Sequence, residues 1–417
     1  MSTPDGRWRL TVHRRDFTIG TLAHGTGIAE LTDARSRRLE TQLNTPAKLT
    51  FTVDGRSPAC EYVAELQTDV MCWRSSAGAD VLMFRGVVSQ SEDVVSEQAH
   101  AVNFTCHDYL AALIRRYLTS NTDLTYAQVD QDDLVTDLVA RANRITSTAG
   151  TSFYPGSQLP LAVALVDPDG RTRGVKSGEL RDRTYPGGTS IGQAIVDLAA
   201  VLSTADSSRT AYDVDVGPAA DTVGHDWLRL WYPERGVDRT DTAALTYPGS
   251  VASFTRSVNS QTYSNYVRVI GDAGGTDGAP QLTADAWTPE ANSVGTVPVG
   301  LWMESDNESD VKVAATLAQK AAGYLTAAGV LMPTYSLTLA PGYYDVGTIN
   351  LGDTVGLVLE SGRLHVATTV RVLGISYSIA DDLEAGEDVE VTVGRPALDL
   401  SAMFRPLKRD IDALARR

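Results

Sequence analysis

The sequence is poor in cysteine and contains no long apolar stretch. Its 417 residues include three cysteines, Cys60, Cys72 and Cys106, an odd number with no CxxC spacing. Buried free thiols are the simplest interpretation, and a disulfide-stapled scaffold is excluded. No run of about 18 apolar residues occurs, so no membrane-spanning helix is predicted. The first ten residues lack the apolar segment of a secretory signal, which predicts folding in a cytoplasm.

Basic residues are outnumbered by acidic ones. The chain has 36 lysines and arginines against 52 aspartates and glutamates, a net charge of −16. Tight binding of nucleic acid is therefore disfavoured, because phosphates require a basic surface. An acidic surface repels DNA, which is useful if DNA must slide past the protein without binding. Solubility alone explains the same charge equally well.

The chain is too long for one hydrophobic core, and two to four domains are expected. The first hundred residues predict strands, because apolar and polar residues alternate between turn residues. In KLTFTV, for example, Leu49, Phe51 and Val53 fall on one face. The closely spaced strands favour a small barrel or sandwich. The expected strands are 7–14, 38–43, 48–53, 69–74, 81–88 and 100–106.

Helical periodicity begins at residue 107. Residues 107–118 carry an apolar stripe with Asp108 placed to cap the helix, and further helices are predicted at 132–145 and 189–202. With strands at 211–216 and 226–232, these predict a mixed α/β segment. Strands return from residue 251, interrupted by an alanine-rich helix at 308–329. The last expected strands are 334–340, 353–379 and 387–394.

Residues 49–106 and 335–393 follow one pattern of strands and turns. Four strands keep the same order and similar spacing over almost sixty residues. Alternating strands alone generate part of such a match, but the ordered landmarks favour a true internal repeat. The landmarks are Asp69 with Asp353, and Gly86 with Gly374.

The sequence therefore predicts a β-rich α+β multidomain protein with two related β-barrel domains, an inserted mixed α/β domain and a smaller helix-containing domain. The expected boundaries are 1–110 for the first barrel, 111–245 for the inserted domain, 246–300 and 334–396 for the second barrel, 301–333 for a helical insertion and 397–417 for a helical tail.

Two long stretches resemble a known family. ARSRRLETQLNTPAKLTFTVDGRSP (34–58) and LGDTVGLVLESGRLHVATTVRVLGISYSI (351–379) are similar to the baseplate-hub or tail-tip minor proteins of tailed bacteriophages. The resemblance covers most of 10–395 and rests on strand and turn patterns. It implies two tail-tube-like barrels per chain and trimers at the distal end of the tail, so that six barrels form a ring.

The resemblance also implies partners. They are a homotrimer, the distal tail or tail tube protein ring above it, a downstream tip or central fibre protein below it, and the tape measure protein. DNA would pass through the ring during ejection without specific binding. Some family members carry a cell-wall hydrolase after the hub. This chain ends at Arg417, about twenty residues past the second expected barrel, so no such domain is expected downstream.

Several motifs invite a chemical interpretation, and each has a simpler structural one. Cys106 and His107 fall on opposite faces of a strand, so strand packing is favoured over a nucleophile pair. DQDD (130–133) and DPDG (167–170) lack the full calcium loop and predict a helix start and a turn. HGTGIAE (24–30) lacks the third glycine of a dinucleotide loop and predicts a turn. No catalytic, cofactor or metal residue is assigned.

Aromatic and apolar residues suggest two binding surfaces. Trp227 and Trp231 share one side of a strand, where core packing competes with sugar stacking. The C-terminal tail has an apolar stripe at helical spacing, which predicts either packing on a barrel or a contact with another molecule. The stripe residues are Leu400, Met403, Phe404, Leu407, Ile411 and Leu414.

The sequence thus predicts a structural virion protein, not an enzyme, that needs no cofactor. It would act as a trimeric hub at the distal end of the phage tail, joining the six-fold tube to the three-fold tip and lining the DNA channel. The alternatives are a tail-associated cell-wall hydrolase, with its site in 111–245, and a glycan-binding host-recognition protein.

Overall fold

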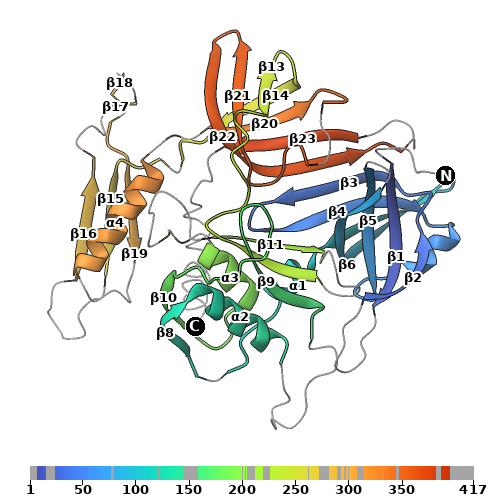
Figure 1. Cartoon of the computed structure of the whole chain (residues 1–417), viewed down its shortest axis with the longest axis horizontal. Coiled ribbons are helices and arrows are strands. Elements are labelled where there is room, and N and C mark those ends of the chain that lie inside the picture. The colour runs from blue at the N-terminus through green and yellow to red at the C-terminus, as the bar shows by residue number, and fades with distance from the viewer. Residues whose placement is uncertain are drawn as a thin grey trace. The chain divides into compact units, whose positions relative to one another are not determined.

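The fold is taken from a computed structural model of the whole chain (Figure 1). The described residues are 7–15, 24–76, 79–120, 122–144, 158–199, 201, 203, 212–218, 226–261, 263–271, 281–288, 293–294, 297–298, 300–307, 314–329, 331, 333–343, 347–381 and 387–394. The chain divides into two compact units. The first comprises Met1–Phe254 and Ser336–Val393, and the second Thr255–Tyr335 and Gly394–Arg417.

The first repeat forms a six-stranded path in the first unit. Its strands pair in the order β3-β4-β7-β6-β5-β1, and β2 (His24–Glu30) adds to β1. In β4 the apolar face predicted from the sequence is buried, and Phe51 packs on Phe104 of β7 with ring centroids 5.4 Å apart. The bounds are β1 Trp8–Arg15, β3 Arg35–Gln42, β4 Thr45–Asp54, β5 Thr68–Ser76, β6 Ala79–Val95 and β7 His100–His107.

The second repeat has the same strand order. Its path is β14-β20-β23-β22-β21-β13, so each strand corresponds in chain order and position to one of the first repeat. The paths differ at one end, where β1 pairs antiparallel with β5 but β13 pairs parallel with β21. The bounds are β13 Ala244–Tyr247, β14 Val251–Val258, β20 Pro333–Leu339, β21 Thr354–Ser361, β22 Leu364–Ile379 and β23 Glu387–Gly394.

The two repeats share one continuous sheet, which corrects the expectation of two separate closed barrels. The first half of β22 pairs with β21, and its second half, Gly374–Ile379, pairs antiparallel with Gln42–Arg37 of β3. Within the described residues the strand pairings do not close a ring in either repeat. β22 has 16 residues, which is long enough to pair with one strand along its first half and with another along its second half. The alternation of residues within a strand does not show which strands it pairs with.

A mixed α/β part lies between the repeats in sequence. The parallel pair β9–β12 and the antiparallel pair β12–β11 form one sheet, and β8–β10 form another. Three helices bury their apolar faces in a shared core with β9, β11 and β12. The bounds are α1 Tyr109–Ile114, β8 Leu124–Asp130, α2 Gln131–Ala142, β9 Leu161–Val166, β10 Leu180–Tyr185, α3 Ile191–Ala199, β11 Asp213–Pro218 and β12 Asp226–Trp231.

The helix starts follow the predicted capping chemistry. The Asp108 carboxylate accepts a hydrogen bond from Leu110 N (3.0 Å), as expected for an N-cap. Asp130 caps α2 in the same way by accepting from Asp132 N (2.9 Å). At the start of α3, Gln193 N donates to Ser190 Oγ (3.3 Å), so Ser190 caps this helix.

The second unit is a three-stranded sheet with a helix on one face. β15 (Tyr266–Ile270) pairs with β16 (Thr283–Trp287) and β19 (Met303–Asn307), and α4 (Ala314–Ala328) packs on β15 and β16. Two short strands, β17 (Ser293–Val294) and β18 (Val297–Pro298), pair with each other. The sequence assigned 246–300 to the second barrel. The difference arises because β15 and β16 pair with β19 and not with the large sheet.

One further expectation is corrected by local structure, and another falls on residues outside the described part of the chain. HGTGIAE, expected to be a turn, is strand β2, because its backbone pairs with β1 across a bulge. The helical tail at 397–417, with Leu400, Met403, Phe404, Leu407, Ile411 and Leu414, lies outside the described residues. Across the described residues, the helices are all too short or too polar to cross a bilayer.

Candidate functional site

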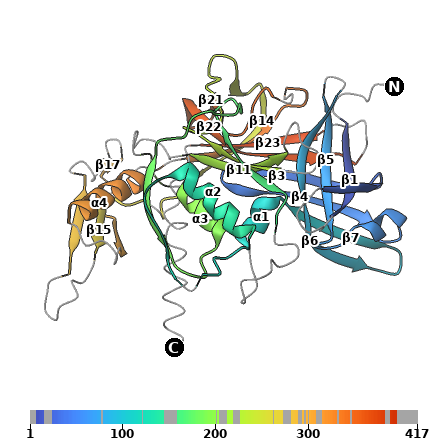
Figure 2. The same cartoon turned by 60° about the horizontal axis from the view of Figure 1, so that its bottom comes forward.

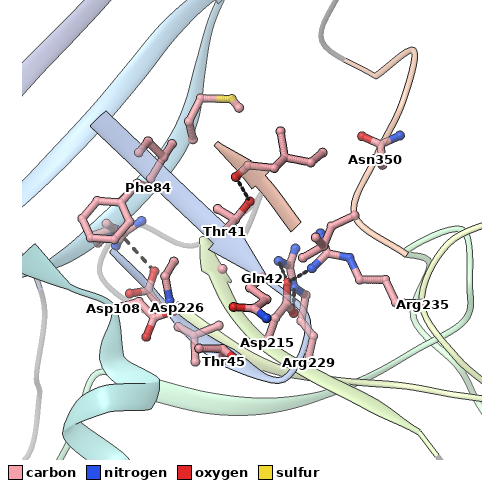
Figure 3. A pocket seen from close by; sticks show the side chains of 18 of the residues that line it. Thr41, Gln42, Thr45, Phe84, Asp108, Asp215, Asp226, Arg229, Arg235 and Asn350 are labelled. Atoms are coloured by element: carbon pink, nitrogen blue, oxygen red, sulfur yellow. Dashed lines mark hydrogen bonds and ion pairs between the residues drawn. The ribbon is translucent and has the colours of Figure 1, made fainter. Parts of the chain in front are cut away.

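A cavity of about 160 Å³ lies where the first repeat meets the α/β part (Figure 3). Strands β3, β4 and β6 contribute one part of the lining and β11 and β12 another. Asn350, Leu351 and two residues of β22, Ile375 and Tyr377, complete it. Its lining is charged for so small a volume. The charged lining residues are Arg85, Asp108, Asp215, Asp226, Arg229 and Arg235.

Asp215 on β11 is the centre of this charge. Its carboxylate accepts hydrogen bonds from Arg229 Nε (2.8 Å) and Nη2 (2.6 Å), from Trp231 Nε1 (2.9 Å), and from Arg235. Burial alone would raise the pKa of Asp215, but the Arg229 and Arg235 guanidiniums outweigh it and lower the pKa to about 2. Asp215 is therefore ionised at neutral pH, which disqualifies it as a general acid.

Asp213, two residues earlier on the same face of β11, ties both repeats to the α/β part. Its carboxylate accepts from Asn44 Nδ2 (3.1 Å), in the β3–β4 turn, and from Arg371 of β22. It also accepts from Arg235 N (2.9 Å). Arg371 donates in addition to the carbonyls of Arg235 (2.8 Å) and Gly352 (3.1 Å). Asp213, Asp215 and Arg371 are buried and Arg229 and Arg235 are partly buried. These five residues form the β11 charge cluster.

The segment after β12 is locked onto the second repeat. Asp353 accepts from Val237 N (2.9 Å) and from Arg239 Nε (2.6 Å). Gly236 and Gly352 approach each other with φ of +90° and +91°, and a Cβ on Gly236 would lie 2.2 Å from the Gly352 carbonyl carbon. Only glycine fits this close, left-handed approach. The cluster and this segment thus fix the two repeats and the α/β part together.

Asp108 also lines the cavity, and both of its carboxylate oxygens are engaged. One accepts from Ala47 N (2.8 Å) and the other from Leu110 N. Burial raises the pKa of Asp108 to about 8, although these backbone N–H groups oppose the rise. Its hydrogen bonds join the end of β7 to the start of β4, which is a structural use of the side chain.

This shift predicts that stability falls as the pH rises from about 4 to about 8. An unfolded aspartate has a pKa of about 3.9, so between about pH 4 and pH 8 the folded state holds a proton that the unfolded state has released. Stability contributed by Asp108 therefore falls as the pH rises through this window. We expect Asp108→Asn to flatten the decrease between pH 6 and pH 9, measured by urea unfolding. An unchanged slope would contradict the assignment.

The sequence motifs with a chemical interpretation take their simpler roles. Cys106 is fully buried, and burial raises the pKa of its thiol, while His107 on the opposite face contacts Ser89 Oγ (2.8 Å). Trp231 is buried with Trp227 packed against it in a small core, so the pair is no sugar-stacking face.

The two acidic motifs are likewise occupied. In DQDD, Asp132 pairs with Arg173 (3.2 Å) and Asp133 with Lys176 (2.6 Å). In DPDG, Asp167 accepts from Arg171 N (2.8 Å) and closes a turn. No cluster of three or more metal-ligating side chains occurs in the described part of the chain.

Sequence reasoning missed the β11 charge cluster. Its signal was present in AYDVDV, where two aspartates alternate with valines inside a strand otherwise suited to burial. Aspartates at alternate positions of a strand share one face, and burial of that face requires cationic partners. The partners are arginines from β12, from the following loop and from β22, which are adjacent only in the fold.

No protein-family model and no curated protein matches this sequence. Solved structures do match along nearly the whole chain. The tail protein from Neisseria meningitidis MC58 aligns with a TM-score of 0.55 at 11% identity, covering 94% of this chain and 98% of that one. The 43 kDa tail protein of prophage MuSo2 from Shewanella oneidensis gives 0.54 at 10% identity, covering 94% and 99%.

A third structure agrees. The prophage tail protein gp18 from Listeria monocytogenes EGD-e aligns with a TM-score of 0.52 at 11% identity, covering 96% of this chain and 98% of that one. The chain therefore has the fold of phage tail proteins, as the resemblance predicted. At such low identity the match establishes the fold, and residue roles do not transfer with it.

Proposed function

We propose that this chain is a structural component of a phage tail that trimerises at the distal end as the hub of the tail tip. In this role three chains present six related modules to a six-fold tube, while the complex itself remains three-fold. The proposed partners are the tail tube ring, a downstream tip or fibre protein and the tape measure protein.

The observation that carries the proposal is the six-strand path that occurs twice in the large sheet with the same order. A chain with two modules of one topology can place two pseudo-equivalent surfaces around an axis. The β11 charge cluster supports this use, because it fixes both modules through Asp213 and so holds them at one angle. The net charge of −16 suits a channel through which DNA slides.

The hydrolase and glycan-binding alternatives gain no comparable support. In the cavity the carboxylates of Asp108 and Asp215 are taken up by backbone N–H groups and arginines. The tryptophans considered for sugar stacking pack in a small core.

The proposal is tested on tails purified from the particle that encodes this chain. Native mass measurement of the released tip should give a complex with three copies, and antibody labelling should mark only the distal end of the tail. Labelling along the tube, or a copy number that is not a multiple of three, would overturn the hub assignment.

A further inference from the structure

The junction between the two repeats supplies a template for a contact between molecules. The second half of β22 pairs antiparallel with β3, and side chains reinforce it through Thr41 Oγ1 to Ile375 O (3.0 Å). A buried ion pair, Arg74 Nη2 to Glu387 Oε1 (2.6 Å), ties the same two repeats. In this fold, then, β3 of the first repeat pairs with the half of β22 that does not pair with β21.

The repeat predicts a second junction of the same kind. In the shared strand order β6 corresponds to β22, and β14 corresponds to β3. The pairing of β6 with β5 ends at Val87, and Leu66 N donates to Val88 O (2.8 Å) where that neighbour ends. Residues 89–95 then pair only with β7 among the described residues. Figure 2 shows β6 and β7 side by side. β14 stands at the end of its strand path. Residues 89–95 of β6 therefore lack a partner strand like the one that β3 provides for β22. Likewise, β14 lacks a partner strand like the one that β22 provides for β3.

The two edges complement each other in charge and in apolar character. On β6, Glu92 and Asp93 are exposed, and Val95 is 68% exposed. On β14, Arg256 is exposed and has no ion-pair partner within the described residues, and Val258 is 39% exposed. Opposite charges on neighbouring strands favour strand pairing. Valines left exposed at an unpaired strand edge promote aggregation, and pairing of the two edges would cover them.

We propose that β14 of one molecule pairs antiparallel with residues 89–95 of β6 in a second copy of this chain. The contact is head-to-tail, because the two edges belong to different repeats, and such contacts close into rings when the rotation allows. Around such a ring, two kinds of junction would alternate. One is the β22–β3 junction within each chain, and the other is the β6–β14 junction between neighbouring chains. The number of copies rests on the proposed trimeric hub, whereas the strand pairing rests on the repeat.

Disulfide trapping tests the pairing in the full-length chain. In a Cys60→Ser background, one cysteine is placed at each position from 89 to 93 and a second at Ser253, Thr255 or Ser257, which are exposed. Facing residues of antiparallel strands have Cα atoms about 4.5–5.5 Å apart, within the range of about 4.4–6.8 Å that a disulfide spans. Mild oxidation should cross-link those variants whose cysteines face each other in one register, giving covalent trimers.

The matched control carries one cysteine at Glu30, an exposed position on β2 at the other end of the strand path, and the second at Ser253. The trapped fraction should exceed this control by about tenfold, since only facing positions reach disulfide geometry. Trimers by native mass without cross-links above the control would overturn the strand pairing and leave the hub in place. Monomers at every concentration, with no cross-links, would overturn both.

Discussion

Asp215→Asn will lower the free energy of unfolding by about 3 kcal/mol at neutral pH, because it removes a buried charge that compensates two partly buried guanidiniums. Asp215 is 9% exposed and takes hydrogen bonds from both Arg229 and Arg235. An asparagine can accept only part of this set, and its amide nitrogen would face cations. Urea unfolding followed by tryptophan fluorescence measures the change, since Trp231 donates to the same carboxylate.

The chain offers a closely matched control in Asp285→Asn. Asp285 faces Arg268 across antiparallel strands, as Asp215 faces Arg229, and accepts from both Nε (2.7 Å) and Nη2 (2.8 Å). Because this pair lies at the surface, screening by water leaves it little net value. The control should change the stability far less. Equal losses in both variants would contradict the view that burial gives the β11 charge cluster its strength.

Asp215→Asn should also change how the stability of the protein depends on pH in acid. With a pKa of about 2 in the folded protein and about 3.9 when unfolded, Asp215 contributes stability that is present above pH 4 and lost as the pH falls towards 2. Asp215→Asn should therefore remove part of the acid sensitivity of the wild-type chain. A parallel loss in both proteins below pH 4 would mean that other carboxylates dominate.

Gly192→Ala will destabilise the α/β part by about 1–3 kcal/mol, because α3 crosses α1 at this residue without room for a methyl group. A Cβ at Gly192 would lie 2.3 Å from Ile114 N and 2.6 Å from the Leu113 carbonyl carbon. Both atoms belong to the α1 backbone, so the helices must separate to admit it. Urea unfolding of the variant measures the loss.

Gly323→Ala is the opposing control for the same substitution in a helix. Gly323 lies within α4, and a Cβ there would meet no atom within 4 Å. Alanine is favoured over glycine in a helix interior by about 1 kcal/mol, so this variant should stabilise the second unit. If both variants gained stability, helix propensity would outweigh the α1–α3 contact at Gly192.

Sequence patterns predicted the local features of this fold well. The apolar stripes and acidic caps placed α1, α2 and α3 within a few residues of their observed bounds, because Asp108 and Asp130 satisfy the first backbone N–H groups of their helices. The repeated strand order was readable because period-two alternation and the turns between strands are both local signals.

Long-range pairing was not readable. The junction of β22 with β3 joins residues more than 330 positions apart. The sequence of neither strand indicates which strand it pairs with. The second unit was misassigned for a related reason. β16, TADAW, alternates polar and weakly apolar residues because only its face towards α4 is covered. β19, MESDN, has one apolar residue, Met303, and so gives little strand signal. The β11 charge cluster draws its arginines from three separate segments, which only the fold assembles.

The β22–β3 junction has a consequence for how the chain matures. Strand β3 leaves the ribosome early, but the segment that covers its edge is synthesised more than 330 residues later. At typical rates of about 5–20 residues per second, the edge stays open for tens of seconds during translation. Contacts so distant along the chain also slow folding. The nascent N-terminal half is therefore the stage at which this protein is most exposed to misassociation and most dependent on a chaperone.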